Sequence, residues 1–191
     1  MVKILQKEAP VLREIAKPVT EDMFGTPELA KILKDMSSAL ASQDDGVAIA
    51  APQIGVSLRI FVVAGDIFEL MHANGDEASN ETDVNNTRTN PEARRPDIVF
   101  INPEIIKLSR EKEVMEEGCL SVRPLYGNTV RSKKARVRAQ DAEGKTFELG
   151  GAGLLAQIFQ HETDHLEGIL FSDHATDLRD IIEEKKGKRS R

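Results

Sequence analysis

The residues best suited to chemistry are two histidines four positions apart, His161 and His165, with Glu162 next to the first. On a helix, positions i and i+4 lie on the same face, so both imidazoles can bind one metal ion. Glu162 then lies beside that ion and can move a proton, which is the arrangement of a metal-dependent hydrolase. The alternative is a pair of surface histidines whose spacing has no function, and the pentapeptide alone does not exclude it.

The sequence around these histidines predicts a helix with a buried face. Leu154, Leu155, Ile158 and Phe159 recur with the helical period, and the histidines fall close to the sector of Leu154 and Ile158. Gly168 is a natural residue after the helix end, because glycine adopts the left-handed conformation without steric cost. Imidazoles that face a core need hydrogen bonds or ligands, and this favours metal binding.

A catalytic metal site needs a third protein ligand. The pattern with a third histidine requires one at position 171, which is Phe171, and the distant acids Glu183 and Glu184 belong to a segment that reads as an ordinary amphipathic helix. Cys119, the single cysteine of the chain, is the better candidate, although lone cysteines are often small buried hydrophobes. One cysteine and no secretory leader indicate a reduced, cytoplasmic protein.

Residues 46–55 place small side chains between two glycines, with one amide, Gln53, among them. Small residues let a backbone approach a ligand closely, and an amide can donate to a developing oxyanion. An Ala- and Gly-rich turn against a core has a similar sequence, so this segment by itself leaves both interpretations open.

Three segments, residues 46–55, 117–121 and 160–168, together resemble the peptide deformylase family. That family carries G-x-G-L-A-A-x-Q-x-G, E-G-C-L-S and Q-H-E-x-D-H-L-x-G in this order. The latter two match completely, and residues 10–13 are similar to the family's P-x-L-R, so the resemblance spans nearly the whole chain. Departures are Ala48 and Ile49 in the first segment, the polar Gln157 where the family usually has an apolar residue of the methionine pocket, and residues 123–126.

The resemblance implies hydrolysis of the N-formyl group from the formylmethionine of nascent polypeptides, with release of formate. Cys119, His161 and His165 would hold one divalent metal ion, natively Fe(II), with Zn, Ni or Co able to replace it. The ligand types alone do not choose among these ions. Glu162 would be the acid–base residue.

The resemblance also implies roles around the metal. The Gln53 amide and the Leu120 backbone N–H would stabilise the oxyanion. Glu117 and Arg131 would form a pair that orients the cysteine loop, for which a plain surface ion pair is the alternative. The residues that would contact the substrate form the wall of its pocket, and ordinary core packing is the alternative interpretation. They are Val47, Ala48, Glu117, Leu154 and Ile158.

We expect one α+β domain over residues 1–191, with antiparallel or mixed sheets packed around the histidine helix and a helical C-terminus. A helix is predicted over residues 27–40, capped by Thr26. Strands are predicted at residues 59–63, 97–101 and 105–108, and a hairpin at 135–140 and 145–149. Residues 72–96 are polar and have almost no apolar side chains, which predicts a mobile loop.

The expected partners are N-formylmethionyl nascent peptides. The basic tail at residues 185–191 would suit the ribosome near its exit tunnel, or it merely complements a helix dipole. No apolar run is long enough for a membrane span, and the net charge of −6 argues against DNA binding. A metallopeptidase and a non-catalytic metal-binding or ribosome-docking module remain the alternative functions.

Overall fold

Two antiparallel sheets, the α-helices α1 and α4 and four short 3-10 helices make up most of the part of the chain that the computed structural model describes, residues 2–67 and 95–180. The five-stranded sheet has the order β1-β2-β3-β6-β7, and the three-stranded sheet has the order β4-β5-β8. The strands are β1 (Ala48–Ala50), β2 (Ile60–Val63), β3 (Ile98–Leu108), β4 (Lys112–Gly118), β5 (Leu125–Ser132), β6 (Lys134–Gln140), β7 (Thr146–Ala152) and β8 (Thr176–Asp180). The predicted α+β class is therefore confirmed.

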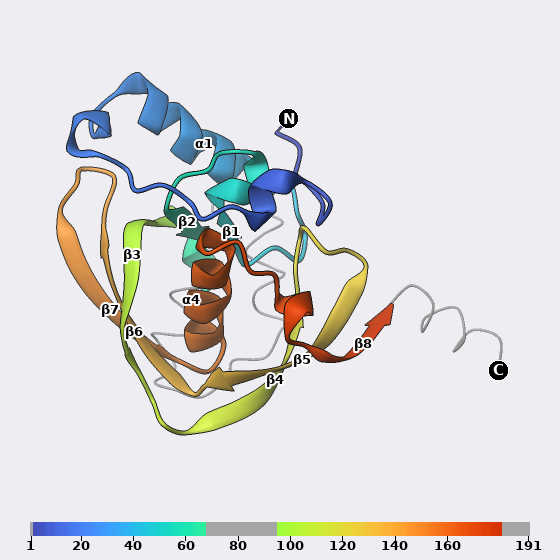
Figure 1. Ribbon diagram of the computed structural model, residues 1–191. Coiled ribbons are helices and arrows are strands. Elements are labelled where there is room, and N and C mark those ends of the chain that lie inside the picture. Colours follow the sequence, from blue (N-terminus) through green and yellow to red (C-terminus); the bar gives the residue numbers. More distant parts are fainter. Residues whose placement is uncertain (1, 68–94, 181–191) are drawn as a thin grey trace.

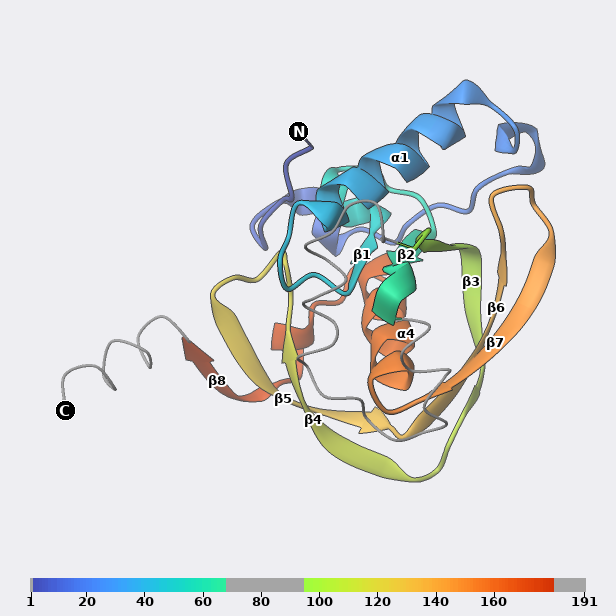
Figure 2. The same cartoon turned by 180° about the vertical axis from the view of Figure 1, so that it is seen from behind.

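The first helix, α1 (Pro27–Ala41), begins as predicted. Thr26 caps it, because its hydroxyl oxygen accepts a hydrogen bond from the Leu29 N–H at 3.2 Å. Leu29, Met36 and Leu40 form its buried face. Seen from behind, α1 crosses above β1 and β2 (Figure 2), so it covers the edge of the five-stranded sheet that bears β1.

The second helix, α4 (Gly153–Leu166), occupies the centre of the molecule. Strands β3, β6 and β7 lie on one side of it, and the three-stranded sheet lies on another (Figure 1). Gly168 follows its end with a φ of 72°, the left-handed conformation that was predicted. This position lets one helix carry residues of the core and residues that face the space between the sheets.

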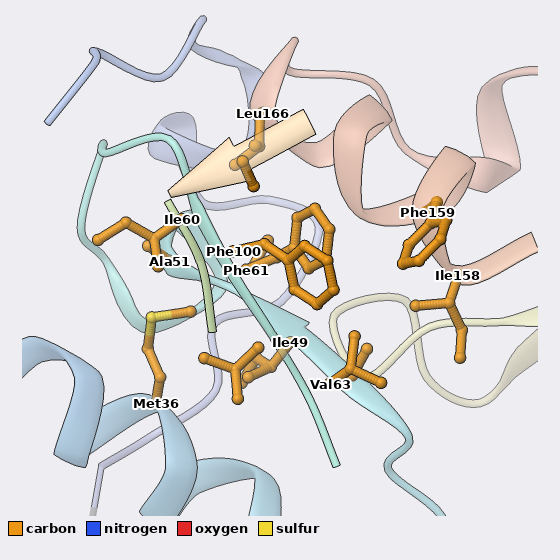
Figure 3. Packing of buried hydrophobic residues seen from close by; sticks show 14 of the residues in the cluster. Met36, Ile49, Ala51, Ile60, Phe61, Val63, Phe100, Ile158, Phe159 and Leu166 are labelled. Carbon is orange, nitrogen blue, oxygen red and sulfur yellow. The ribbon is translucent and has the colours of Figure 1, made fainter. Parts of the chain in front are cut away.

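A mainly aliphatic core with a small aromatic cluster joins α4 to the five-stranded sheet. Phe61 and Phe100 stack with ring centroids 4.5 Å apart, and Phe159 of α4 lies edge-on to Phe100 at 5.5 Å. Figure 3 shows these rings beside Ile49 and Val63, with Met36 approaching from α1. The side of α4 opposite the histidines is therefore fixed against the sheet by close packing.

The predicted strands at 59–63 and in the hairpin are confirmed to within a few residues. The two strands predicted at 97–101 and 105–108 are wrong as separate elements, because β3 runs through both with register shifts. Asn102, at φ 50°, lies at one shift. Its side chain bonds to the Val19 backbone and to Gln140, so the irregularity is held without ending the strand.

Of the C-terminal segment predicted as an amphipathic helix, only the part up to Asp180 is described, and that part is not helical. Leu178 and its neighbours belong to β8, which pairs with β5 at the edge of the three-stranded sheet. Residues 181–191, including Glu183, Glu184 and the basic tail, lie outside the described residues, as does the predicted loop at 72–96 except for its last two positions. No described helix is both long and apolar enough to cross a membrane.

Candidate metal centre

Helix α4 presents His161 and His165 on the side that faces the three-stranded sheet. Their ring centroids are 5.0 Å apart, as expected for positions i and i+4. His165 is almost fully buried, and His161 has a side chain that is 12% exposed. The helix thus brings two imidazoles together where one can still be reached from outside.

Cys119 reaches the same point from the end of β4. Its Sγ lies 3.2 Å from Nε2 of His165. The sulfur and one ring nitrogen from each histidine all lie within 4.8 Å of one another. Gly118 is required before the cysteine, because a Cβ there would come within 2.5 Å of the Tyr126 ring. The sequence prediction that joined Cys119 to the two histidines is therefore matched in space.

An ion-pair network fixes the orientation of His161. The Arg131 guanidinium donates Nε and Nη2 to the two Glu117 oxygens at 2.7 and 3.0 Å, and Nη1 to Asp164 at 2.6 Å. One Glu117 oxygen also lies 3.1 Å from Nδ1 of His161. Since Nδ1 is engaged by a carboxylate, Nε2 is the nitrogen left to face Cys119. Glu117 and Arg131 are buried, so the alternative of a surface ion pair is wrong.

Burial and neighbouring charges move the pKa values of these groups in opposite directions. Burial by itself lowers the pKa of His161, but hydrogen bonds with Cys119 and Glu117 raise it well above its ordinary value. Burial and then the neighbouring His161 charge lower the pKa of His165 well below its ordinary value. At His161 the hydrogen-bond partners therefore outweigh burial, whereas at His165 burial prevails.

Glu162 is 4% exposed and lies against this cluster. Burial raises its pKa to about 7, an effect that the His161 charge opposes and the Glu117 charge reinforces. Among the described residues, neither Oε2 of Glu162 nor Nδ1 of His165 has a hydrogen-bond partner. A buried carboxyl with a free oxygen and a pKa near neutrality is suited to proton transfer.

Gln53 approaches the cysteine from the 3-10 turn η3 (Ala51–Ile54). Its Oε1 accepts a hydrogen bond from the Ala50 N–H at 2.8 Å, which fixes the amide. Its Nε2 then donates to Ser121 Oγ at 3.1 Å and to Cys119 Sγ at 3.6 Å. The amide N–H group therefore points toward the cluster.

A cavity of about 190 Å³ opens directly onto the cluster. It lies between β1 and β4, which are both edge strands of their sheets, and α4 forms its floor. All the residues predicted to contact substrate line it, together with Gln53, Leu120 and Glu162: Val47, Ala48, Glu117, Leu154 and Ile158. Leu154 was expected to face the core but is 39% exposed at the mouth of this cavity. Arg131 lies behind the wall.

The sequence did not indicate the polar rim of this cavity. Asp45 and Arg123 form an ion pair that joins the β1 side to the β4 side. Glu116 and Tyr126 also line the rim, and the Glu116 carboxylate pairs with Arg179 of β8. In the sequence, the one indication of these polar residues was that residues 123–126 depart from the family's usual pattern. Only the fold places Asp45 opposite them.

Comparisons with known proteins identify the family of this chain. The family model described as polypeptide deformylase matches residues 1–180. A peptide deformylase of Erythrobacter litoralis is 37% identical over 191 residues, covering 99% of this chain and 96% of its own length. One from Bartonella quintana is 39% identical over 183 residues, covering 95% of this chain and 89% of its own.

Solved structures give the same result. A Met-Ala-Ser-bound class I type b peptide deformylase from Acinetobacter baumannii superposes with a TM-score of 0.73 at 30% identity, covering 91% of this chain and 98% of its own. A peptide deformylase from Legionella pneumophila has a TM-score of 0.71 at 35% identity, covering 99% of this chain and 92% of its own. The chain therefore belongs to the peptide deformylase family, metal-dependent hydrolases that remove the N-formyl group from nascent peptides.

Proposed function

We propose that Cys119, His161 and His165 hold one divalent metal ion and that Glu162 is the acid–base residue for hydrolysis of the formyl amide of N-formylmethionyl peptides. The observation that carries this proposal is a thiol and two imidazoles within 4.8 Å of one another, next to a buried carboxyl with a free oxygen and at the end of a cavity.

The three donors fit a first-row ion. Metal bonds of about 2.0–2.3 Å in tetrahedral geometry place neighbouring ligand atoms about 3.3–3.8 Å apart. The Cys119 and His165 donors are 3.2 Å apart, and the whole set is within 4.8 Å, so small side-chain movements complete the geometry. Thiolate with two imidazoles suits several such ions. We propose Fe(II) as the native ion, with Zn, Ni or Co able to replace it.

A divalent ion held by Cys119, His161 and His165 would acidify water and polarise the formyl oxygen. Glu162 takes the proton of the attacking water and passes it to the leaving nitrogen. The Gln53 amide and the Leu120 N–H donate hydrogen bonds to the formyl oxygen as it gains negative charge. Water adds to the formyl carbon, the C–N bond breaks, and the products are formate and a peptide with a free amino terminus.

The peptide lies along the cavity between β1 and β4, which are edge strands and can each be extended by a further strand. Val47, Leu154 and Ile158 supply the apolar contacts for the first side chain. Ala48 adds a methyl group where a glycine would let the peptide come closer, and it therefore narrows this path. A related deformylase structure from Acinetobacter baumannii is bound to Met-Ala-Ser, and another to actinonin.

We also propose that residues 1–191 act as one domain in the cytoplasm, where the free thiol of Cys119 stays reduced. The lysines and arginines of residues 185–191 would bring the enzyme to the ribosome near the emerging chain. Co-sedimentation of the full chain and of a chain ending at residue 184 with ribosomes tests this part. Equal co-sedimentation of the two would contradict it.

The activity itself is tested by formate release from formyl-Met-Ala-Ser, with bound metal quantified in the same samples. Glu162→Ala should keep the metal and lose turnover, whereas Glu143→Ala, in an exposed turn, should keep both. Full turnover by Glu162→Ala would refute the role of that residue. Cleavage of a peptide bond without formate release would instead indicate a metallopeptidase.

A further inference from the structure

Gln157 is a polar residue that α4 contributes to the floor of the cavity, besides His161 and Glu162. It lies one helical turn before His161, between Leu154 and Ile158 in the cavity lining. Its Nε2 donates a hydrogen bond to the Glu116 carbonyl oxygen at 2.8 Å. This bond uses one of the two N–H groups and leaves the other N–H and the Oε1 atom for further contacts.

The position of Gln157 corresponds to the end of a methionine side chain. Four residues of α-helix separate its Cα from that of His161 by about 6 Å along the axis. From the formyl carbon, five bonds lead through N, Cα, Cβ and Cγ to the thioether sulfur, a span of about 6 Å when extended. A formyl group held at the metal ligands would therefore bring the methionine sulfur to the level of Gln157 if the side chain extends along α4 toward Leu154.

An amide at that level does not suit a thioether, which is a weak acceptor. The neighbouring Val47, Leu154 and Ile158 already supply apolar contact. Oxidation of methionine to its sulfoxide places a strong hydrogen-bond acceptor on the sulfur and makes the side chain polar. The second N–H of Gln157 can donate to that oxygen without losing its bond to Glu116.

We propose that Gln157 lets this enzyme deformylate peptides whose initiating formylmethionine is oxidised to the sulfoxide. This rests on the proposed deformylase activity. The reaction is the same hydrolysis: one water is consumed, the formyl C–N bond breaks, and formate and the sulfoxide-bearing amine are released with no change in the oxidation state of sulfur. Gln157 binds the side chain and takes no part in the bond changes.

The test compares kcat/KM for three peptides: formyl-Met-Ala-Ser, formyl-norleucine-Ala-Ser and formyl-methionine sulfoxide-Ala-Ser. Wild type should process the sulfoxide within about tenfold of the methionine peptide. Gln157→Met has a side chain of similar length but lacks the amide. In this variant, the ratio of kcat/KM for the sulfoxide peptide to kcat/KM for the methionine peptide should be about tenfold lower than in wild type. Gln140→Met, which removes an amide on β6 outside the cavity, should leave the ratio unchanged.

A second variant tests hydrogen-bond donation. Gln157→Glu keeps a polar side chain but replaces the N–H donor with an acceptor. Its kcat/KM for the sulfoxide peptide, relative to the methionine peptide, should therefore fall as it does in Gln157→Met. An unchanged ratio in Gln157→Met, an equal fall for all three peptides, or sulfoxide turnover retained by Gln157→Glu would each overturn the proposal. If wild type released no formate from any of the three peptides, the deformylase function itself would fail.

Discussion

Replacement of Arg131 by methionine tests whether a buried ion pair supports the metal ligands. Arg131 and Glu117 have side chains that are 7% and 2% exposed, and the guanidinium supplies two hydrogen bonds to Glu117 and one to Asp164. Methionine has a similar length and is apolar, so the substitution leaves the Glu117 carboxylate buried with only His161 as a partner. The variant should therefore be much less stable.

The expected loss is about 3–5 kcal/mol, the usual cost of breaking a buried pair by removing one partner. For a chain of this length that corresponds to a fall in the melting temperature of about 6–20 °C. Metal affinity should also fall by about 10–100-fold, because Glu117 without its bonds to Arg131 holds the His161 ring less firmly. Replacing both partners, in Arg131→Met with Glu117→Gln, should cost less stability than Arg131→Met alone, since no unpaired charge is buried.

The loss of stability in Arg131→Met should also depend on pH. Burial raises the pKa of Glu117, but hydrogen bonds with His161 and Arg131 prevail and hold it well below its ordinary value of 4.5. A carboxylate with a depressed folded-state pKa stabilises the protein fully above the unfolded value, and this contribution is lost as pH falls. The difference between wild type and Arg131→Met should therefore be constant near neutrality and shrink as the pH drops below about 4.5.

Urea unfolding of both proteins, with metal content measured separately, gives the comparison. Arg138→Met is the matched control, because Arg138 pairs with Glu148 at the surface with side chains 51% and 38% exposed. That pair should contribute less than about 1 kcal/mol. If Arg131→Met lost no more stability than Arg138→Met, the buried network would have no supporting role and the reasoning would be refuted.

Three further changes have defined outcomes. Cys119→Ser should reduce bound divalent metal at least about tenfold by mass spectrometry of the native protein, since a hydroxyl is a poor replacement for a thiolate; equal loading would remove Cys119 from the ligand set. Gly118→Ala should lower the unfolding free energy by about 1–3 kcal/mol, because the new methyl group meets the Tyr126 ring, and an unchanged denaturation midpoint would contradict this. Thr26→Ala should lower the unfolding free energy by about 0.5–2 kcal/mol, because the α1 cap is lost. Thermal unfolding measures this loss, and formate release should not change.

The sequence predicted the histidine helix well because its signals are local. Apolar residues at helical spacing, a glycine after the end and two histidines one turn apart specify the helix and its face without other parts of the chain. The α1 cap and the hairpin of β6 and β7 were predicted for the same reason. The segments 46–55 and 117–121 were recognised as a set, so the candidate ligands and the oxyanion donor were named before the fold was known.

Strand pairing depends on distant partners, and there the sequence was insufficient. The edge strand β8 has an apolar pattern too short to distinguish a strand from a helix, and its pairing with β5 decides its structure. β3 continues across an irregularity because Asn102 bonds to Val19 and Gln140, which lie far away in the chain. Neither outcome follows from local preference.

The sequence by itself determined the chemistry: a thiol, two imidazoles, a carboxyl and an amide in segments whose spacing is that of one family. Only the tertiary structure decided the orientations and the pKa values of these groups. It buries Arg131 and Glu117 behind His161 and shields Glu162 from water, and both effects come from packing α4 between two sheets.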